Sequence, residues 1–115
     1  MQTHFQHKAN QLTLVTSTGT YFFNPEEIVR LEASSNYTNI FFTNKNKILS
    51  AKVLKEFAKI LEPFGFVRTH RTHLVNRQHI YCVTPEGNVI MKDDSVAEIS
   101  RRMKRGVMKV LKGAA

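Results

Sequence analysis

The sequence contains no tryptophan, one cysteine and three prolines among its 115 residues. One cysteine excludes a disulfide framework within a single chain. No apolar stretch reaches the ~18 residues that a membrane-spanning helix requires, and the first residues are too polar for a signal peptide. These features predict a cytoplasmic protein without membrane contact. The lone Cys82 lies in an apolar run at residues 79–83, which is typical of a buried strand.

Carboxylates are also scarce: nine Asp plus Glu stand against 17 Lys plus Arg, and the formal net charge is +8. Such a charge predicts attraction to phosphate polymers or anionic membranes. All nine carboxylates lie outside three windows, residues 33–55, 63–85 and 99–115, which hold 13 of the 17 cations. If folding brings these windows to one side, they form a continuous positive face suited to phosphates.

The remaining composition supports one folded domain. Hydrophobic residues make up 42% of the chain, with eight Phe and three Tyr, which distinguishes it from a disordered basic tail. A length of 115 residues suits one domain and is too short for two ordinary ones. We therefore predict a polar leader over residues 1–11 and a single domain over residues 12–115.

Alternating apolar and polar residues between turn signals predict a mostly β fold. Ten short strands are expected, at residues 12–16, 20–24, 28–33, 37–43, 47–51, 66–68, 73–76, 79–84, 88–92 and 96–99. Apolar residues at helical spacing predict one amphipathic helix near residues 52–62, ended by Pro63 and Gly65. Ser100 is a candidate cap for a short basic helix over residues 101–111.

One polar and cationic cluster lies between two apolar ends. Residues 66–76 read Phe-Val-Arg-Thr-His-Arg-Thr-His-Leu-Val-Asn and contain no carboxylate. Arg, His, Thr and Asn side chains can donate hydrogen bonds to anionic oxygens and to base edges without repelling a polyanion. The cluster therefore favours a surface that binds nucleic acid.

The pattern of motifs resembles the LytTR-type DNA-binding domain, the effector domain of LytTR-family bacterial response regulators. Four pieces carry the resemblance: Leu31-Glu32-Ala33 followed by Asn36-Tyr37, the cluster at 68–72 closing on Leu74-Val75-Asn76, the strand that contains Ile80, and Ser100-Arg101-Arg102. The resemblance spans roughly residues 12–111, almost the whole chain. The resemblance implies an elongated arrangement of about ten short strands in small sheets, whose loops enter successive major grooves on one side of a DNA duplex.

The resemblance also implies which residues contact DNA. Its base-reading positions fall on Thr38, Asn39, Asn76 and Arg102. Its phosphate-binding positions fall on His70, Arg71, Arg77, Arg101, Lys104 and Arg105. Family members often carry a charged or imidazole side chain at the positions of Thr38 and Asn39. The scheme requires Asn76 and Arg102 to face one shared flank of the molecule.

Residue chemistry supports these roles and also leaves structural alternatives open. Asn can pair with adenine and Arg with guanine through two hydrogen bonds each, whereas cations on phosphates add affinity without reading sequence. Asn76 also fits a turn residue or loop cap, and Arg101 with Arg102 also fits solvent-exposed charge at a helix start. His70 fits a hydrogen bond in a β corner, and Tyr37 fits a packing role.

Other functions have weaker support in the sequence. The alternative is a single-stranded DNA or RNA-binding β module that stacks bases on surface aromatics; we expect Phe22, Phe23, Phe41 and Phe42 to pack in the core or on a sheet face instead. No nucleophile constellation is evident, so we expect neither enzyme activity nor a cofactor. His70 and His73, three apart on a strand, are expected to point to opposite faces and to bind no metal.

The expected partner is double-stranded DNA at repeated promoter sites. LytTR-type domains commonly follow a receiver domain of about 120 residues, for which this chain has no room. The sequence therefore fits both an effector domain separated from an upstream receiver and a stand-alone protein. In the first case, phosphorylation of the receiver would act by pairing protomers on adjacent half-sites.

Overall fold

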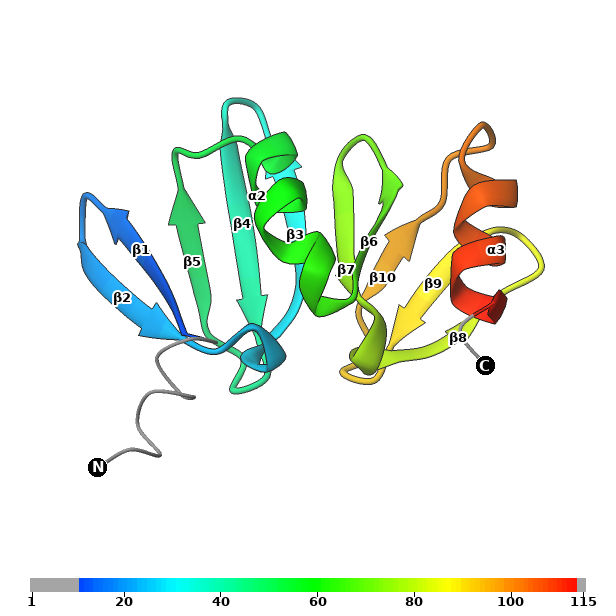
Figure 1. Cartoon of the computed structure of the whole chain (residues 1–115), viewed down its shortest axis with the longest axis horizontal. Helices are drawn as coiled ribbons and strands as arrows, with labels where there is room; N and C mark the ends of the chain where they lie inside the picture. The colour runs from blue at the N-terminus through cyan, green and yellow to red at the C-terminus, as the bar shows by residue number, and fades with distance from the viewer. Residues whose placement is uncertain (1–10, 114–115) are drawn as a thin grey trace.

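A computed structural model of the chain describes residues 11–113 (Figure 1). Ten strands lie in this part: β1 (Leu12–Thr16), β2 (Gly19–Phe23), β3 (Ile28–Ser34), β4 (Tyr37–Phe42), β5 (Lys47–Ser50), β6 (Phe66–His70), β7 (His73–Asn76), β8 (Ile80–Val83), β9 (Asn88–Met91) and β10 (Val96–Glu98). The helices of the same residues are α2 (Leu54–Leu61), α3 (Lys104–Gly113) and the short 3-10 helices η1 (Pro25–Glu27), η2 (Glu62–Phe64) and η3 (Arg77–His79). None of them is long and apolar enough to cross a membrane.

The mostly β prediction is confirmed, because all ten expected strands form within a few residues of their expected bounds. The predicted helix near residues 52–62 is α2, and the predicted basic helix is α3. Helix α3 begins at Lys104 rather than at residue 101, because residues 101–103 form a turn first. The predicted leader, except for residue 11, lies outside the described residues.

The strands form three antiparallel sheets, with the orders β1-β2, β5-β4-β3-β7-β6 and β10-β9-β8. Neighbouring strands of an antiparallel sheet run in opposite directions, so the end of one strand lies beside the start of the next at the same edge of the sheet. The β3–β4 turn, the end of β5 and the β6–β7 turn therefore lie together, at the top of Figure 1. We call this side the loop edge, defined by residues 34–36, 51–53, 71–72 and 100–103, and the opposite side the far edge. The molecule is elongated, with extents of 46 × 34 × 24 Å.

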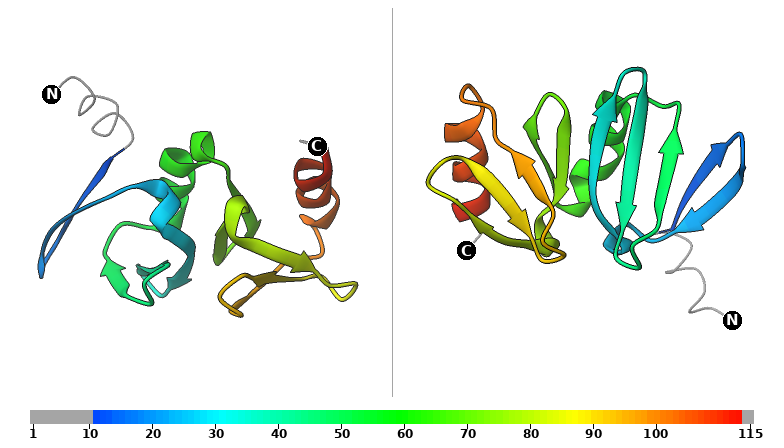
Figure 2. Two further views of the ribbon diagram at one scale, coloured as in Figure 1. Left: turned by 90° about the horizontal axis from the view of Figure 1, so that it is seen from below. Right: turned by 180° about the vertical axis from the view of Figure 1, so that it is seen from behind.

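Two hydrophobic clusters share the β6–β7 hairpin as a common wall. Phe66 and Leu74 belong to the first cluster, which α2 covers through Leu54, Phe57 and Leu61. The next residue on each strand, Val67 or Val75, faces the second cluster, which packs between the three-stranded sheet and α3. Strand alternation explains the division, because successive side chains point to opposite faces. Figure 2 shows both helices on the same side of the molecule.

The expectation that Cys82 is buried is wrong. Cys82 is exposed rather than buried, because a register shift after Ile80 places it opposite Ile90 on the outer face of the edge strand β8. Phe22 is 63% exposed, whereas Phe23 and Phe42 pack edge to face in the first cluster with ring centroids 5.3 Å apart.

The expectation that His70 and His73 point to opposite faces is also wrong. A register shift between Arg68 and His70 makes the two histidines cross-strand partners, with ring centroids 5.5 Å apart. Among residues 11–113, no group of three or more His, Cys, Asp or Glu side chains could hold a metal ion.

Candidate nucleic-acid interface

The loops of the loop edge are fastened to one another by backbone hydrogen bonds. The N–H of Ala33, at the end of β3, donates to the carbonyl of Thr72 in the β6–β7 turn, at 2.9 Å. The N–H of Ser100 donates to the carbonyl of Thr69 on β6, also at 2.9 Å. These bonds join segments that are far apart in sequence, so the β3–β4, β6–β7 and β10–α3 loops form one continuous surface.

Two buried threonines hold the same loops from inside. The hydroxyl of Thr38 donates to the carbonyl of Lys52 at 2.8 Å and ties β4 to the loop before α2. The hydroxyl of Thr69 donates to the carbonyl of Glu98 at 2.9 Å and ties β6 to β10. Both side chains are 0% exposed. The prediction that Thr38 reads bases is therefore wrong for this conformation, because its hydroxyl is enclosed and already bonded.

The β6–β7 turn presents Arg71 to solvent. Its backbone is held by Arg68, whose guanidinium donates to the carbonyls of His70 and Arg71. The N–H of Thr72 donates to Nδ1 of His70 at 3.1 Å. His70 is half-buried, and its Nε2 lies 4.0 Å from Glu98. Arg71 is thus an exposed cation at the tip of a braced hairpin.

The β10–α3 loop presents a second group of cations. The hydroxyl oxygen of Ser100 accepts from the N–H of Met103 at 3.2 Å, which shapes the turn before α3. Arg101 and Arg102 lie exposed in this turn, and Lys104 and Arg105 lie exposed at the start of the helix. Cations at a helix N-terminus oppose the helix dipole, and the unpaired N–H groups there attract anions. The arrangement therefore favours an external anion next to the start of α3.

Asn76 lies at the end of β7 on the far edge, away from this surface. It is 1% exposed. Its Nδ2 donates to the carbonyl of Ile28 at 2.9 Å, and its Oδ1 accepts from the N–H of Gln78 at 3.0 Å, capping η3. The predictions that Asn76 reads bases and shares a flank with Arg102 are wrong in this conformation, and the loop-cap alternative is confirmed.

Arg77 follows on the far edge and also has a structural partner. Its guanidinium donates to the carbonyl of Leu111 in the last turn of α3, at 2.7 Å. A cation at this end of a helix stabilises the free carbonyl groups. Arg77 and Arg101 thus lie at opposite ends of α3, and the phosphate contact of Arg77 stays a prediction.

Asn39 lies near the loop edge but not at its tip. It is half-buried on β4, where it pairs with Glu32 on one side and Leu49 on the other. The exposed residues of the adjoining turn are Ser35 and Asn36, which the site prediction did not include. The turn signal at residues 34–36 was sufficient to find them, because the tip of a hairpin reaches farther than its strands.

The three windows without carboxylates, residues 33–55, 63–85 and 99–115, bring their cations together only in part. Lys52, Arg71 and the cations at residues 101–105 lie at the loop edge, whereas Lys45 lies in the β4–β5 turn and Lys112 at the end of α3, both on the far edge. Each window includes elements that cross the molecule, so each has residues at both edges. The predicted continuous positive face is therefore limited to the loop edge.

Arg30 is a buried cation that is joined to Asp93 through the hydroxyl of Ser95. Arg30 is 9% exposed, its Nη1 lies 2.8 Å from Glu32, and its guanidinium carbon lies 4.2 Å from the ring centroid of Phe41. Its Nε donates to the hydroxyl of Ser95. Burial raises the pKa of Asp93, but hydrogen bonds from Ser95 and the charge of Arg30 outweigh this and leave the pKa below its ordinary value.

His73 is the buried ionisable side chain beneath the β6–β7 turn. It is 8% exposed, and its Nδ1 has no hydrogen-bond partner among the described residues. Burial lowers the pKa of His73, and the negative charge of Glu32 offsets this only partly. His73 is therefore held neutral, so it adds no positive charge to the loop edge.

Comparisons with known proteins point to one family. The LytTr DNA-binding domain family matches residues 5–112. A solved structure described as the LytTr DNA-binding domain of a methyl-accepting/DNA response regulator from Bacillus cereus matches with a TM-score of 0.75 and 23% sequence identity. The match covers 90% of this chain and 97% of that chain. The search of curated proteins gave no match. The fold expected from the resemblance is thus confirmed.

Proposed function

The chain belongs to the LytTr DNA-binding domain family, and on this premise we propose that it is a sequence-specific double-stranded DNA-binding domain of a bacterial transcriptional regulator. Its loops read major grooves from the loop edge. Its function is binding rather than catalysis, and it acts in the cytoplasm.

The observation that carries this proposal is the fastening of three loops on one edge with exposed arginines on two of them. Arg71 and the pair Arg101 and Arg102 are presented by loops that hydrogen-bond to each other through Thr69 and Ser100. The long axis of the whole molecule measures 46 Å, and the three loops are arranged along it (Figure 1). One turn of B-DNA repeats every ~34–36 Å, so the molecule is longer than one turn and can lie along one side of a duplex.

The exposed aromatic side chains are scattered over the molecule, which favours duplex over single-stranded nucleic acid as the ligand. Single-strand binding proteins stack successive bases on neighbouring aromatic side chains. Phe22, Tyr37 and Tyr81 are 63%, 48% and 74% exposed, but they lie on β2, β4 and β8, which belong to three different sheets. Residues 11–113 therefore offer no continuous stacking surface.

The proposed roles follow exposure and position. Arg102 reads base edges, and so does Arg71, which the family resemblance gave as a phosphate contact. Each is exposed on a braced loop, and an arginine can bind guanine through two hydrogen bonds. Arg101, Lys104 and Arg105 bind phosphates around the start of α3. Less exposed positions have secondary roles: Asn39 contributes to the base contacts of the β3–β4 turn, and His70 supports phosphate binding beside Arg71.

The regulatory setting follows from the family and from the geometry. Target sites occur as repeats in promoters, because one domain covers only a short stretch of duplex and pairs of domains gain affinity through effective concentration. An upstream receiver domain or a second protomer supplies that pairing.

A competition experiment tests the proposal. A labelled duplex selected from a random pool is bound to the protein at physiological salt, and unlabelled selected duplex, scrambled duplex and the selected single strand compete with it. The proposal expects the selected duplex to compete best and log K to fall by ~0.9 per neutralised phosphate per log unit of salt. A single strand that competes better than the duplex would establish the alternative function, and equal competition by the scrambled duplex would remove the claim of specificity.

A further inference from the structure

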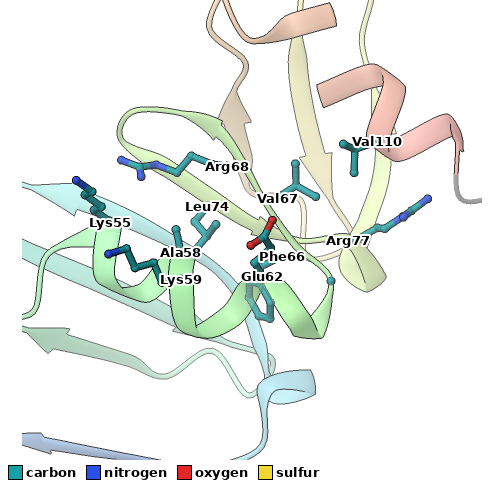
Figure 3. A pocket seen from close by; sticks show the side chains of 11 residues that line it. Lys55, Ala58, Lys59, Glu62, Phe66, Val67, Arg68, Leu74, Arg77 and Val110 are labelled. Atoms are coloured by element: carbon teal, nitrogen blue, oxygen red, sulfur yellow. The ribbon is translucent and has the colours of Figure 1, made fainter. Parts of the chain in front are cut away.

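A groove separates the two helices on the face that carries both of them (Figure 3). It lies between α2, β6 and α3 and has a volume of about 610 Å³. Helix α2 covers the first hydrophobic cluster and α3 the second, so the strip of the β6–β7 hairpin between them stays partly uncovered. Half-buried Val67 lies in this strip, half-buried Ala58 of α2 borders it, and Val110 of α3 is 50% exposed beside it.

The rim of this groove is cationic, in contrast to its apolar floor. Lys55 and Lys59 project from the exposed side of α2, and the guanidinium groups of Arg68 and Arg77 lie at the β6 side and near α3 (Figure 3). Glu62 is the single carboxylate among the lining residues that the structure describes. An apolar floor within a positive rim complements a ligand that combines apolar side chains with negative charge.

We propose that this groove docks an acidic amphipathic helix of a partner protein. Such a helix places apolar side chains three and four residues apart on one face, which suits a narrow apolar strip, and carries Asp or Glu along its flanks to meet the lysines. The groove's volume accommodates side chains from one helix face rather than a whole helix. It gives the domain a contact with protein in addition to its proposed contact with DNA.

DNA is a poorer occupant of the groove than a helix. Phosphates gain nothing from the floor at Val67 or from Val110 beside it, because apolar side chains offer them no hydrogen bonds. The groove opens on the helix-bearing face, whereas Arg71 and Arg102 lie on the loop edge, the upper rim of the molecule in Figure 1. A partner in the groove and a duplex on the loop edge therefore bind at the same time.

The test uses a labelled synthetic helical peptide of about 18 residues, with Leu at positions i, i+3, i+4 and i+7 and Glu on the flanks. A second peptide carries Lys in place of every Glu. The protein variants are Lys59→Glu, which reverses a rim charge, and Val110→Glu, which places a carboxylate at an exposed site beside the floor. Lys92→Glu is the matched control, because Lys92 is exposed and does not line the groove.

Fluorescence anisotropy is expected to show binding of the acidic peptide to the unaltered domain and no comparable binding of the Lys peptide. Lys59→Glu and Val110→Glu each raise the Kd roughly tenfold, and Lys92→Glu leaves it unchanged. Equal affinity for both peptides would overturn the proposal, as would equal effects of all three substitutions. Displacement of the peptide by the selected duplex would also overturn it, because the groove would then belong to the DNA surface.

Discussion

Asn76→Ala separates the structural role of Asn76 from the base-reading role that its sequence position implied. The side chain is 1% exposed and forms hydrogen bonds to two segments of the far edge, residues 25–28 and Gln78. Nδ2 donates to the carbonyl of Ile28 at 2.9 Å and more weakly to that of Pro25 at 3.4 Å, and Oδ1 accepts from the N–H of Gln78 at 3.0 Å. The substitution removes all three bonds and leaves buried partners unsatisfied.

The expected loss in the free energy of unfolding follows from this count. Each net hydrogen bond contributes about 1 kcal/mol, and a loop cap lost to Ala costs about 1 kcal/mol. Two good bonds and one weak bond give a loss of about 2–4 kcal/mol. A domain of this size has a stability of roughly 6–17 kcal/mol at the usual 0.05–0.15 kcal/mol per residue, so the variant remains folded at 25 °C. Its Tm should fall by roughly 10 °C.

Arg71→Ala is the matched control on the same hairpin. Arg71 is exposed at the turn, so its removal should change the free energy of unfolding by less than about 0.5 kcal/mol. It should instead reduce the preference for selected over scrambled duplex by ~1–3 kcal/mol. Urea unfolding measures the first quantity and duplex competition at 25 °C the second.

The two variants should therefore show opposite patterns. Folded Asn76→Ala protein should keep the duplex preference of the unaltered domain. The assignment is refuted if Asn76→Ala leaves the urea midpoint in place and relaxes the base preference, because the side chain would then be free to contact DNA.

Further predictions concern the DNA contacts, the core, the loop fastening and pH. Arg102→Ala should relax base preference, whereas Lys104→Ala should weaken all duplexes evenly and lower the salt slope by about 0.9; equal effects of both on selected and scrambled DNA would contradict the division of roles. Phe57→Ala, at a side chain 5% exposed, should cost ~3–5 kcal/mol of unfolding free energy, and unchanged thermal unfolding would show that this face of α2 does not pack. Thr69→Val should lower the unfolding free energy by about 1 kcal/mol and also weaken the selected duplex, since it releases the β10–α3 loop from β6; full DNA affinity would show that the fastening is irrelevant to binding. Because burial lowers the pKa of His73 in the folded state, stability is complete above its unfolded pKa of ~6.5 and falls as the pH drops below that value; His73→Phe should reduce this loss in urea titrations at pH 7.5 and 5.5, and an unchanged pH dependence would assign it to other groups.

The strands and helices were predictable because their signals are local. Alternation in β3 and β4, the polar turn at residues 34–36 and the helical spacing of Leu54, Phe57 and Leu61 each lie within one short window. The position of Arg71 was also predictable. Strands at 66–68 and 73–76 leave residues 69–72 as the turn of a hairpin, which puts Arg71 at the tip and Asn76 at the opposite end.

The errors in the site prediction arise from partners that are distant in the sequence. The hydroxyl of Thr38 is bonded to a carbonyl 14 residues away, and the amide of Asn76 to one 48 residues away. The sequence shows which polar side chain is present, but it does not show whether that side chain bonds to a DNA base or to a carbonyl group inside the protein. Only the packing of distant segments decides between these uses.

These internal bonds have a consequence for recognition. A loop that must become ordered on binding loses affinity through the conformational entropy of that ordering. Here the β6–β7 turn is braced by Arg68 and joined to β3, and the β10–α3 loop is joined to β6 through Ser100 and Thr69. The backbone segments that carry Arg71 and Arg102 are therefore joined to one another before DNA arrives. Because a rigid spacing matches one register of bases better than the others, we expect the buried threonines to contribute to the proposed sequence preference without touching a base.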